Sequence, residues 1–319
     1  MTAGLTNVTP VIANRDITWE QSSEYNYGFD LSVLNNRINL SAEYYYSETI
    51  QMLYEQTALS ITGFQNFWNN IGKVANKGFE FELRTLNLNK KNFQWESSFN
   101  LSLNRNELLD LAGEVRQINY GERQEGYLAE VGHPSIQYYL YKTIGVWKSQ
   151  EEIDANPHHT NDKPGGLRVW DADGNGEITD ADRVPCGTPF PDFTWGFTNT
   201  FNFYGFDVNI LLQGTQGGKL FNGDGYYNET WKFNKEFKDT NYWITPNNPG
   251  DGKTPYQMVG IDPELTDYLL EDASYWSIKD IVIGYKFPKT ISKKLGLNSL
   301  RYMRLHKIYT YILLATTEV

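Results

Sequence analysis

The sequence predicts an all-β protein, organised as an antiparallel transmembrane β-barrel segment with long external loops. Three observations predict this class. Apolar and polar residues alternate with a period of two, as they do on the two faces of a strand. The clearest alternating segments run to about ten residues, which suits a strand that crosses a bilayer better than the usual five or six. Short and long connections alternate between the segments, as they do in outer-membrane barrels.

The first predicted hairpin covers residues 25–46. Odd positions in 25–33 are apolar or aromatic, and after Asn35 and Asn36 the apolar set moves to the even positions in 38–46. A tight turn at the two asparagines joins two strands in this interpretation, because asparagine tolerates the backbone conformation that such turns need.

Two further hairpins follow the same design. Apolar residues alternate over 79–83 and 93–103, with 87–92 as the connector, and again over 193–203 and 206–216 around Tyr204 and Gly205. We expect these apolar side chains to face lipid, among them Phe197, Phe203, Phe206, Val208 and Ile210. The opposite face is polar and is expected to line a lumen, with Glu80, Glu82, Arg84, Glu96, Asn100, Asn199, Asn202, Asp207 and Asn209.

The connections also predict which end of the sheet is which. Short connections are expected at 35–36, 87–92, 204–205 and 288–298, and long ones at 47–74, 105–192 and 216–272. Short turns are periplasmic and long loops external in outer-membrane barrels. If every short turn shares one side, residues 105–192 contain an even number of crossings. The strand-like stretch 138–147 then needs a second strand as a partner, for which 166–170 is the candidate.

Composition excludes several other classes. Acidic residues exceed basic ones by 11, which argues against a protein that binds nucleic acid through its phosphates. The single Cys186 excludes an intramolecular disulfide framework. No apolar run is long enough for a transmembrane helix, and the first residues do not form a secretory signal peptide. A soluble antiparallel sandwich also alternates in this way, so a secreted, Ca²⁺-stabilised β-sandwich that binds glycans stays open as the alternative.

Several segments, in consistent order, resemble the SusC/RagA-type TonB-linked outer-membrane transporters, or TonB-dependent receptors, of Bacteroidota. The resemblance covers about residues 10–305. The segments that carry it are Asp16-Ile-Thr-Trp-Glu-Gln, Tyr25-Asn-Tyr-Gly-Phe-Asp, Leu34-Asn-Asn-Arg-Ile, Asn76-Lys-Gly-Phe-Glu-Phe-Glu-Leu, the acidic stretch 171–183, Pro191-Asp-Phe-Thr-Trp-Gly-Phe and Leu212-Gln-Gly-Thr-Gln-Gly.

The resemblance implies a 22-stranded barrel plugged by an N-terminal domain. The chain has room for about eight or nine of those strands, so residues 1–319 are expected to be part of the C-terminal barrel, without plug domain, signal peptide or closing strand. Residues 306–319 depart from the family pattern and are expected to be a frameshifted tail. The implied function is import of oligosaccharides or peptides across the outer membrane, with a SusD-like surface lipoprotein and the TonB complex as partners.

An acidic loop carries the sharpest local motif. Its oxygen-bearing residues follow the spacing of a calcium-binding loop: Asp171, Asp173, Asn175, Glu177 through its backbone carbonyl, and Asp182. Hard oxygen ligands suit Ca²⁺. The last position is Asp, which is shorter than the usual bidentate Glu. The alternative is an Asx-rich loop closed by its own hydrogen bonds, and both interpretations stay open.

No catalytic motif is found, and no enzyme is predicted. The adjacent His158 and His159 lie in a polar stretch that is more typical of a solvated loop than of a metal site. Aromatic residues among Asn, Gly and Asp are candidates for stacking on a sugar, with packing between loops as the alternative. These candidates are Trp68, Tyr226, Tyr227, Trp231 and Trp243.

Overall fold

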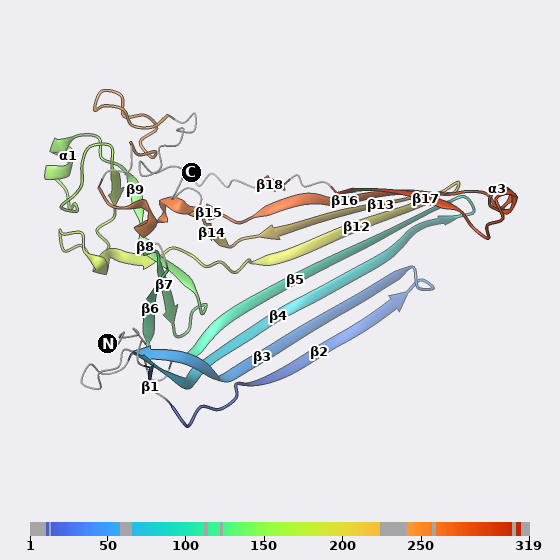
Figure 1. The fold of residues 1–319 in the computed structure, drawn as a ribbon, viewed down its shortest axis with the longest axis horizontal. Helices are drawn as coiled ribbons and strands as arrows, with labels where there is room; N and C mark the ends of the chain where they lie inside the picture. Colours follow the sequence, from blue (N-terminus) through green and yellow to red (C-terminus); the bar gives the residue numbers. More distant parts are fainter. Residues whose placement is uncertain are drawn as a thin grey trace, which may run out of the picture.

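The computed structural model is dominated by one large sheet (Figure 1). The described residues are 11–12, 14–57, 66–111, 114–121, 124–223, 241–256, 260–307 and 311–313. The main path of the sheet contains β2 (Gln21–Val33), β3 (Ile38–Thr57), β4 (Asn66–Lys90), β5 (Phe93–Leu111), β12 (Phe193–Phe203), β13 (Phe206–Gln216), β16 (Tyr275–Lys286) and β17 (Arg301–Lys307). Two short strands join this path, β1 (Val11–Ile12) beside β4 and β18 (Tyr311–Leu313) beside β16.

Strand order confirms an all-β, antiparallel architecture. The strands lie side by side in the order β17-β16-β13-β12-β5-β4-β3-β2. Each strand pairs with the next one in this order, and the loops leave the sheet at its ends. With 25 residues, β4 is the longest strand, about 80 Å if fully extended. Among the described residues, no helix has the length and hydropathy needed to cross a membrane.

One apolar row crosses the sheet from strand to strand. In the first hairpin Tyr25 lies opposite Tyr46 and Val33 opposite Ile38, as the alternation predicts. The row continues through the pairs Leu40–Leu83, Leu83–Phe99, Phe99–Phe197 and Phe197–Leu212. Every residue of β2 is exposed, with 69% exposure at Tyr27. The apolar face is therefore built for contact with something other than the rest of the described chain.

The apolar face ends in a row of aromatic rings beside the short turns. Phe93, Phe203, Phe206, Tyr285 and Phe287 form this turn-end aromatic row, with neighbouring ring centroids 4.6–6.5 Å apart. The rings come from β5, β12, β13 and β16 and from the residue after β16. Contacts of this kind stabilise adjacent strands, and they place a continuous aromatic border at one level of the sheet.

Asn199 does not lie on the polar face, and that prediction is wrong. It occupies the apolar row between Phe197 and Phe201, opposite Ser97 of β5. Its Oδ1 accepts hydrogen bonds from Trp95 Nε1 at 3.0 Å and from Ser97 Oγ at 2.7 Å. These two bonds satisfy the amide oxygen, which explains how a polar side chain is tolerated among aromatic ones.

The short turns gather at one end of the sheet, together with the small helix α3 (Lys289–Lys294) (Figure 1). Leu34, Asn35 and Asn36 all have positive φ, between 54° and 62°, and Tyr204 and Gly205 have φ of 47° and 89°. Both predicted turns are thus confirmed. The connector predicted at 87–92 is shorter than expected, because β4 continues to Lys90 and leaves a two-residue turn.

The long connections are partly strand. β3 reaches Thr57 and β4 starts at Asn66, so most of the loop expected at 47–74 belongs to the sheet. The described residues between 114 and 192 leave the main sheet and form small sheets of their own. One has the order β11-β8-β7-β6 and the other pairs β10 with β9. The stretch 138–147 does pair with the 166–170 region, but neither crosses the main sheet, so the interpretation as a crossing is wrong.

We call the described parts of residues 114–187 and 241–272 the outer fold. Its elements are β6 (Arg116–Tyr120), β7 (Gly126–Glu130), β8 (Gln137–Tyr141), β9 (Thr143–Val146), α1 (Gln150–Asp154), β10 (Leu167–Val169), η2 (Asp180–Asp182), β11 (Arg183–Pro185), η4 (Pro263–Leu265), η5 (Asp267–Leu269) and β15 (Leu270–Asp272), the last paired with β14 (Lys219–Phe221). Trp147, Leu140, Ile153 and Leu167 are at most 1% exposed. A conventional hydrophobic core therefore lies here, at the end opposite to the short turns (Figure 1).

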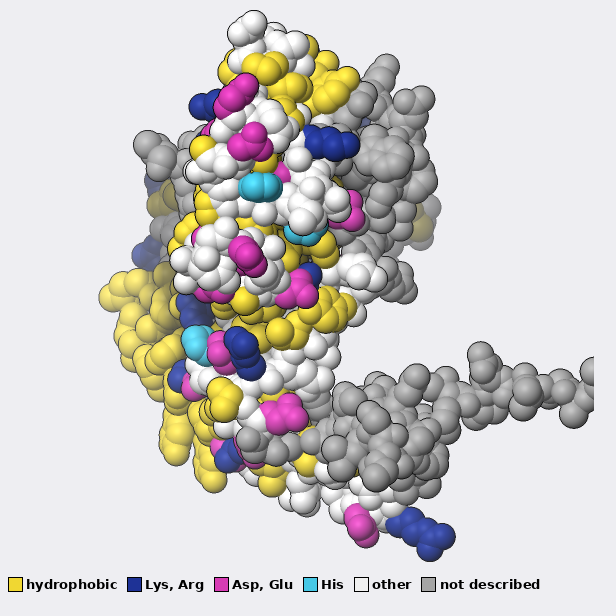
Figure 2. Space-filling model, turned by 90° about the vertical axis from the view of Figure 1, so that its left-hand side faces the viewer, with side chains coloured by type: hydrophobic (Ala, Val, Ile, Leu, Met, Phe, Trp, Pro, Cys, Tyr) yellow, Lys and Arg dark blue, Asp and Glu magenta, His cyan; other side chains and the backbone are white. Residues whose placement is uncertain are grey.

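The outer fold rests on the ends of the long strands. Val74 of β4, Leu108 and Leu111 of β5 and Ala129 of β7 form one buried cluster. The Leu108 N–H donates to the carbonyl oxygen of His133, and the Gly132 N–H donates to that of Leu108. Figure 2, which looks onto this end, shows hydrophobic side chains gathered along one margin and charged ones spread over the rest of the visible surface.

The turn at Gly205 provides a test of the pairing between β12 and β13. A Cβ there would lie 3.0 Å from the Lys286 carbonyl oxygen on a residue with φ of +89°. We expect Gly205→Ala to lower the free energy of unfolding by about 1–2 kcal/mol, because alanine is strained in the left-handed region. Denaturant unfolding of the chain folded in detergent measures this value.

Gly28→Ala is the matched control. Gly28 lies inside β2, where a Cβ would meet its nearest neighbour at an ordinary 3.5 Å. Its unfolding free energy should stay within about 0.5 kcal/mol of the parent. Equal effects of the two substitutions would contradict the turn geometry.

Candidate functional site

The acidic loop lies between β10 and β11 in the outer fold. Two glycines with positive φ, Gly174 at 72° and Gly176 at 88°, give the backbone its tight path. The short η2 follows, and its N-cap Thr179 accepts from Ala181 N while Asp182 reaches back to the Thr179 N–H. This capping box fixes Asp182 at the end of the loop.

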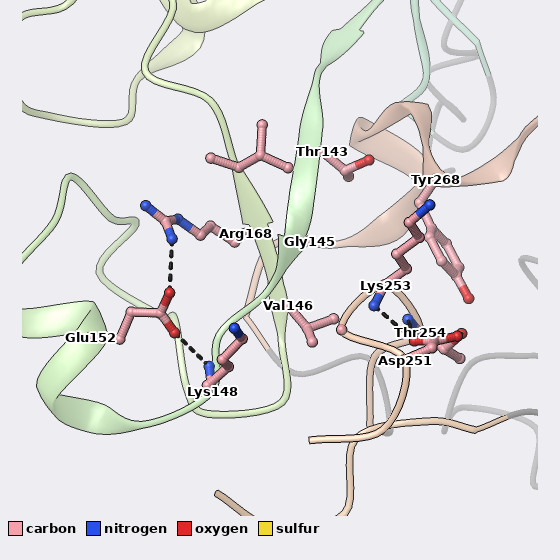
Figure 3. Close-up of a pocket in the computed structure, with 12 residues that line it drawn as sticks. Thr143, Gly145, Val146, Lys148, Glu152, Arg168, Asp251, Lys253, Thr254 and Tyr268 are labelled. Atoms are coloured by element: carbon pink, nitrogen blue, oxygen red, sulfur yellow. Dashed lines mark hydrogen bonds and ion pairs between the residues drawn. The ribbon is translucent and has the colours of Figure 1, made fainter. Parts of the chain in front are cut away.

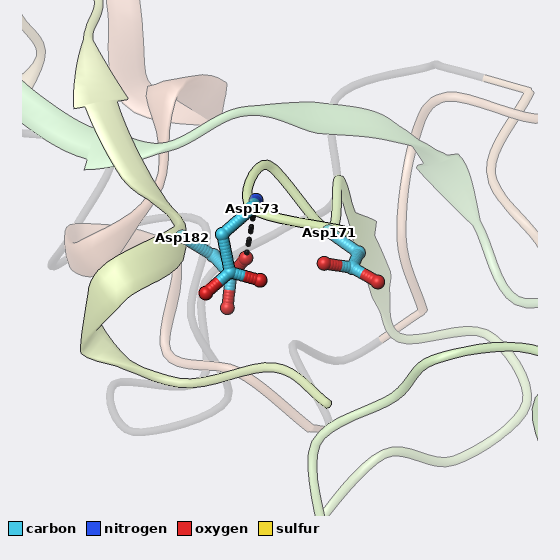
Figure 4. A group of neighbouring side chains, drawn as sticks. All are labelled: Asp171, Asp173 and Asp182. Atoms are coloured by element: carbon cyan, nitrogen blue, oxygen red, sulfur yellow. Dashed lines mark hydrogen bonds between the residues drawn. The ribbon is translucent and has the colours of Figure 1, made fainter. Parts of the chain in front are cut away.

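Three carboxylates meet at this loop (Figure 4). Asp171, Asp173 and Asp182 each offer an oxygen, and these oxygens all lie within 4.8 Å of one another. Asp182 is fully buried. Like charges at such a separation repel by about 1 kcal/mol per pair even in water, and by more where water is excluded. A bound cation would offset this repulsion.

Backbone N–H groups already engage the same oxygens. Asp171 accepts from Gly174 and Gly176, Asn175 Oδ1 accepts from Glu177 N, and Asp182 accepts from Ala172 and Thr179. These bonds are those of an Asx-rich loop. A carboxylate oxygen has a second lone pair, so the bonds leave room for a metal. The Glu177 side chain is exposed, which leaves its backbone carbonyl as the ligand expected from it.

A polar cavity of about 710 Å³ lies beside β9 (Figure 3). Glu152 accepts from Arg168 Nη1 and from the Lys148 N–H, both at 2.8 Å, and Asp251 accepts from the Lys253 and Thr254 N–H groups at 2.7 Å. Both carboxylates are thereby engaged. Hydrogen-bonding groups line a cavity of this size, which is within the range of small-ligand sites.

A buried tryptophan supports the wall of this cavity. Trp147 Nε1 donates to Asp162 Oδ2 at 3.0 Å, and the Arg168 guanidinium lies 4.8 Å from the centre of the Trp147 ring. Burial raises the pKa of the Asp162 carboxyl, and hydrogen bonds from the His159 N–H and from Trp147 partly counteract this. These contacts hold β9, β10 and the segment after α1 in one arrangement.

The predicted aromatic residues have different surroundings. Trp68 on β4 is 42% exposed, and its carbonyl oxygen accepts from Asn14 Nδ2. Trp243 is 8% exposed, packs with Val146 and Leu167, and donates to the Lys148 carbonyl oxygen. Burial of Trp243 favours the alternative of loop packing for that residue. Tyr226, Tyr227 and Trp231 lie outside the described residues.

Sequence reasoning did not find the cavity. Its charged residues, Lys148, Glu152, Arg168, Asp251 and Lys253, come from segments about a hundred positions apart. Side-chain periodicity carries no information on such contacts between loops. The acidic loop was found because all of its candidate ligands lie within twelve consecutive residues.

Comparison with known proteins places the chain among outer-membrane receptors. No protein-family model matches it. The chain is 32% identical over 323 residues to TonB-dependent receptor P26 of Formosa agariphila, covering 98% of this chain and 31% of that protein. It is 24% identical over 291 residues to TonB-dependent receptor SusC of Bacteroides thetaiotaomicron, covering 87% of this chain and 27% of that one.

The fold is similar to a solved transporter. Superposition on a structure of the RagAB peptide transporter gives a TM-score of 0.75 at 24% identity, covering 94% of this chain and 33% of that one. The chain thus spans about a third of the length of the proteins that it matches.

Cys186 provides a probe of the outer fold. Burial raises the pKa of its thiol to about 12, and its Sγ lies 3.4 Å from the Val184 carbonyl oxygen. Only the thiolate reacts with maleimides. At pH 8 we expect labelling about a thousandfold slower than for an unperturbed cysteine with a pKa of about 8.5.

Labelling kinetics across pH 7–9 measure this, with the denatured chain as the reference. The rate should rise about tenfold per pH unit, because the thiolate fraction grows up to the raised pKa. Labelling of the folded chain at the denatured rate would show that Cys186 is not held as described.

Proposed function

The chain belongs to the SusC/RagA-type TonB-dependent receptors, which are outer-membrane proteins, and from this premise we propose that it forms barrel wall and external loops of a nutrient importer. The observation that carries the proposal is the main sheet itself, with an exposed apolar face, a polar opposite face and its short turns at one end. We propose that the apolar face contacts lipid and the polar face lines the lumen.

The spacing of the aromatic residues supports this proposal. On β12, Phe203 belongs to the turn-end aromatic row and Trp195 lies eight residues away on the same face. Eight residues span about 26 Å along a strand, close to the roughly 25 Å height of the apolar band of outer-membrane barrels. On β2 the apolar set from Tyr25 to Val33 has the same extent.

Exposure counts against the sandwich alternative. A sandwich buries one face of each sheet against the other. Tyr27 and Phe29 on β2 are 69% and 58% exposed, and Phe79 on β4 is 58% exposed. Apolar residues in such a row suit lipid, and a glycan-binding sandwich would have covered them.

Further strands would complete the barrel. Within the described sheet β2 and β17 each have one neighbour, and open backbone edges are too costly in lipid. We therefore propose that this chain supplies about eight or nine of 22 strands, as part of a C-terminal barrel whose plug domain is elsewhere.

The proposed cargo is an oligosaccharide or a peptide. Import would use a SusD-like surface lipoprotein and the TonB complex, with recognition rather than catalysis as the task of this chain. The cavity beside β9 and the exposed Trp68 offer hydrogen bonds and an aromatic surface at the loop end. Trp243, Tyr226, Tyr227 and Trp231 stay in the proposed binding set only as sequence candidates.

Uptake by cells tests the importer. Cells that carry the transporter should accumulate a labelled oligosaccharide or peptide, and deletion of the gene for the proposed SusD-like partner or of the gene for TonB should abolish accumulation. Growth on complex glycans and on peptides as alternative sole nutrients distinguishes the two cargo classes. Unchanged uptake of both classes after deletion of the transporter gene would overturn the proposal.

Side-chain orientation can be tested on β13. Val208 lies on the apolar face and the adjacent Asn209 on the polar face, where its Nδ2 donates to Thr200 Oγ1. Spin labels at 208 should be accessible to lipid-soluble quenchers, and labels at 209 to aqueous ones. Val208→Arg should cost about 1–3 kcal/mol of barrel stability, because Val208 lies between the turn-end aromatic row and the midplane, with Asn209→Arg as the milder control. Reversed accessibility would contradict the barrel assignment.

We also propose that the acidic loop binds one structural Ca²⁺ through Asp171, Asp173, Asn175, the Glu177 carbonyl and Asp182. The meeting of three carboxylates supports this site. Calorimetry should give a dissociation constant on the order of 0.1–1 mM, as in extracellular modules. Asp171→Ala combined with Asp173→Ala should abolish binding, whereas Glu177→Gln should keep it because the carbonyl is unchanged. Equal binding by all three proteins would refute the site.

A further inference from the structure

The end of the sheet that carries the short turns (Figure 1) is rich in basic residues. The segments 34–37, 87–93, 203–207 and 285–301 form this end, and together they contain eight basic residues and one acidic residue. The rest of the chain then holds 20 basic residues against 38 acidic ones, out of totals of 28 and 39. The turn end is therefore positive in a chain whose net charge is strongly negative.

The acidic residue at this end, Asp207, is already engaged. Arg301 of β17 reaches across β16 to the Asp207 carboxylate, over Gly284, which has no side chain to block the contact. Arg37 donates to the carbonyl oxygens of Leu86 and Asn87.

Six lysines remain, which we call the turn-end lysines. All six are exposed, and no ion pair to a carboxylate is found for any of them in the described part of the chain. They are Lys90, Lys91, Lys286, Lys289, Lys293 and Lys294.

Three of the turn-end lysines border one cavity. Lys90, Lys91 and Lys286 line a space of about 430 Å³ between the turn after β4 and the turn at Tyr204. The Lys286 N–H donates to the Gly205 carbonyl oxygen at 2.8 Å, which fixes the end of β16 against that turn. The turn geometry, and not chance proximity of flexible side chains, therefore brings these three residues together.

The turn-end aromatic row fixes the depth of these lysines. Lys90 lies opposite Phe93, and Lys286 directly follows Tyr285. Aromatic belts lie at the level of lipid headgroups in membrane proteins. On and after α3, exposed Ile291, Leu295 and Leu297 lie among lysines, a pattern typical of segments that rest on a membrane surface. Both observations place the ammonium groups beside headgroup phosphates.

We propose that the turn-end lysines bind the phosphates of anionic phospholipids in the leaflet that surrounds the short turns. This rests on the proposed function, since only a sheet in the bilayer brings its turn end to that leaflet. Lipid fits better than an acidic protein because the aromatic row and the apolar residues of α3 adjoin the lysines. Lysines near an anionic membrane surface favour it by about fivefold each.

The test uses the purified transporter in nanodiscs of phosphatidylcholine with about one-fifth phosphatidylglycerol. Mass spectrometry of the lipids that remain bound after detergent extraction gives the ratio of the two. We expect phosphatidylglycerol to be enriched over the bulk. In the triple variant Lys90→Gln, Lys91→Gln, Lys286→Gln, the enrichment of phosphatidylglycerol should fall by at least about fivefold. The control variant Lys148→Gln, Lys163→Gln, Lys253→Gln removes the same charge at the loop end and should retain it.

Each other result overturns the proposal. Equal loss in both triple variants would show a general effect of net charge. Absence of enrichment in the parent protein would favour an acidic protein as the partner of the turn-end lysines. Binding of inorganic phosphate in detergent, without lipid selectivity, would identify free phosphate as the ligand. If labels at Val208 are not exposed to lipid, the proposed function fails as well. Lipid-exposed labels without enrichment refute this inference alone.

Discussion

The long strands depend on backbone pairing, because a bilayer offers no water to replace a missing hydrogen-bond partner. Eleven consecutive residue pairs join β12 to β13, without a register shift. Over most of their length the described strands have little packed core to assist them: all 13 residues of β2 are exposed, and the buried apolar residues of β4 and β5 lie at the loop end. Backbone hydrogen bonds between the strands therefore specify the sheet. The side chains on each face determine whether that face contacts lipid or water. This division explains why the strands alternate so regularly.

The outer fold follows the opposite rule. Its strands have three to five residues each, too few for a ladder to stabilise alone. Buried side chains such as Trp147 and Leu140 hold them together, and Trp147 Nε1 donates to Asp162 Oδ2 inside this core. Packed side chains exclude water from the interior of the outer fold. The acidic loop and the cavity beside β9 rest on that packed core. Function at the loop end thus rests on a core that the sheet lacks.

Sequence alone predicted the features that repeat or are local. The hairpins were recoverable because residues that tolerate positive φ interrupt the period-two alternation at the turns, at Asn35 and Asn36 and again at Gly205. The prediction failed at Asn199, whose partners Trp95 and Ser97 come from another strand. Unpaired residues in the ladder, Asn87 of β4 and Lys279 of β16, also shift the alternation by one position. The outer fold could not be predicted, because its strands are too short to show a period-two alternation. The alternating stretch 138–147 was therefore interpreted as a membrane crossing.

The surroundings of the side chains change along single strands, from exposed near the short turns to buried at the loop end. On β4, Phe79 on the apolar face is 58% exposed, whereas Val74, five residues nearer the loop end and on the opposite face, is 7% exposed and packs with Leu108 and Ala129. A register shift between Lys73 and Val74 marks the same place. The outer fold therefore packs against the face that is polar over the rest of the strand, and it buries apolar side chains there. The base of the outer fold is therefore continuous with the sheet. A movement of β7 relative to the sheet would have to open the Val74 cluster, since Ala129 of β7 is packed between Val74 of β4 and the leucines of β5.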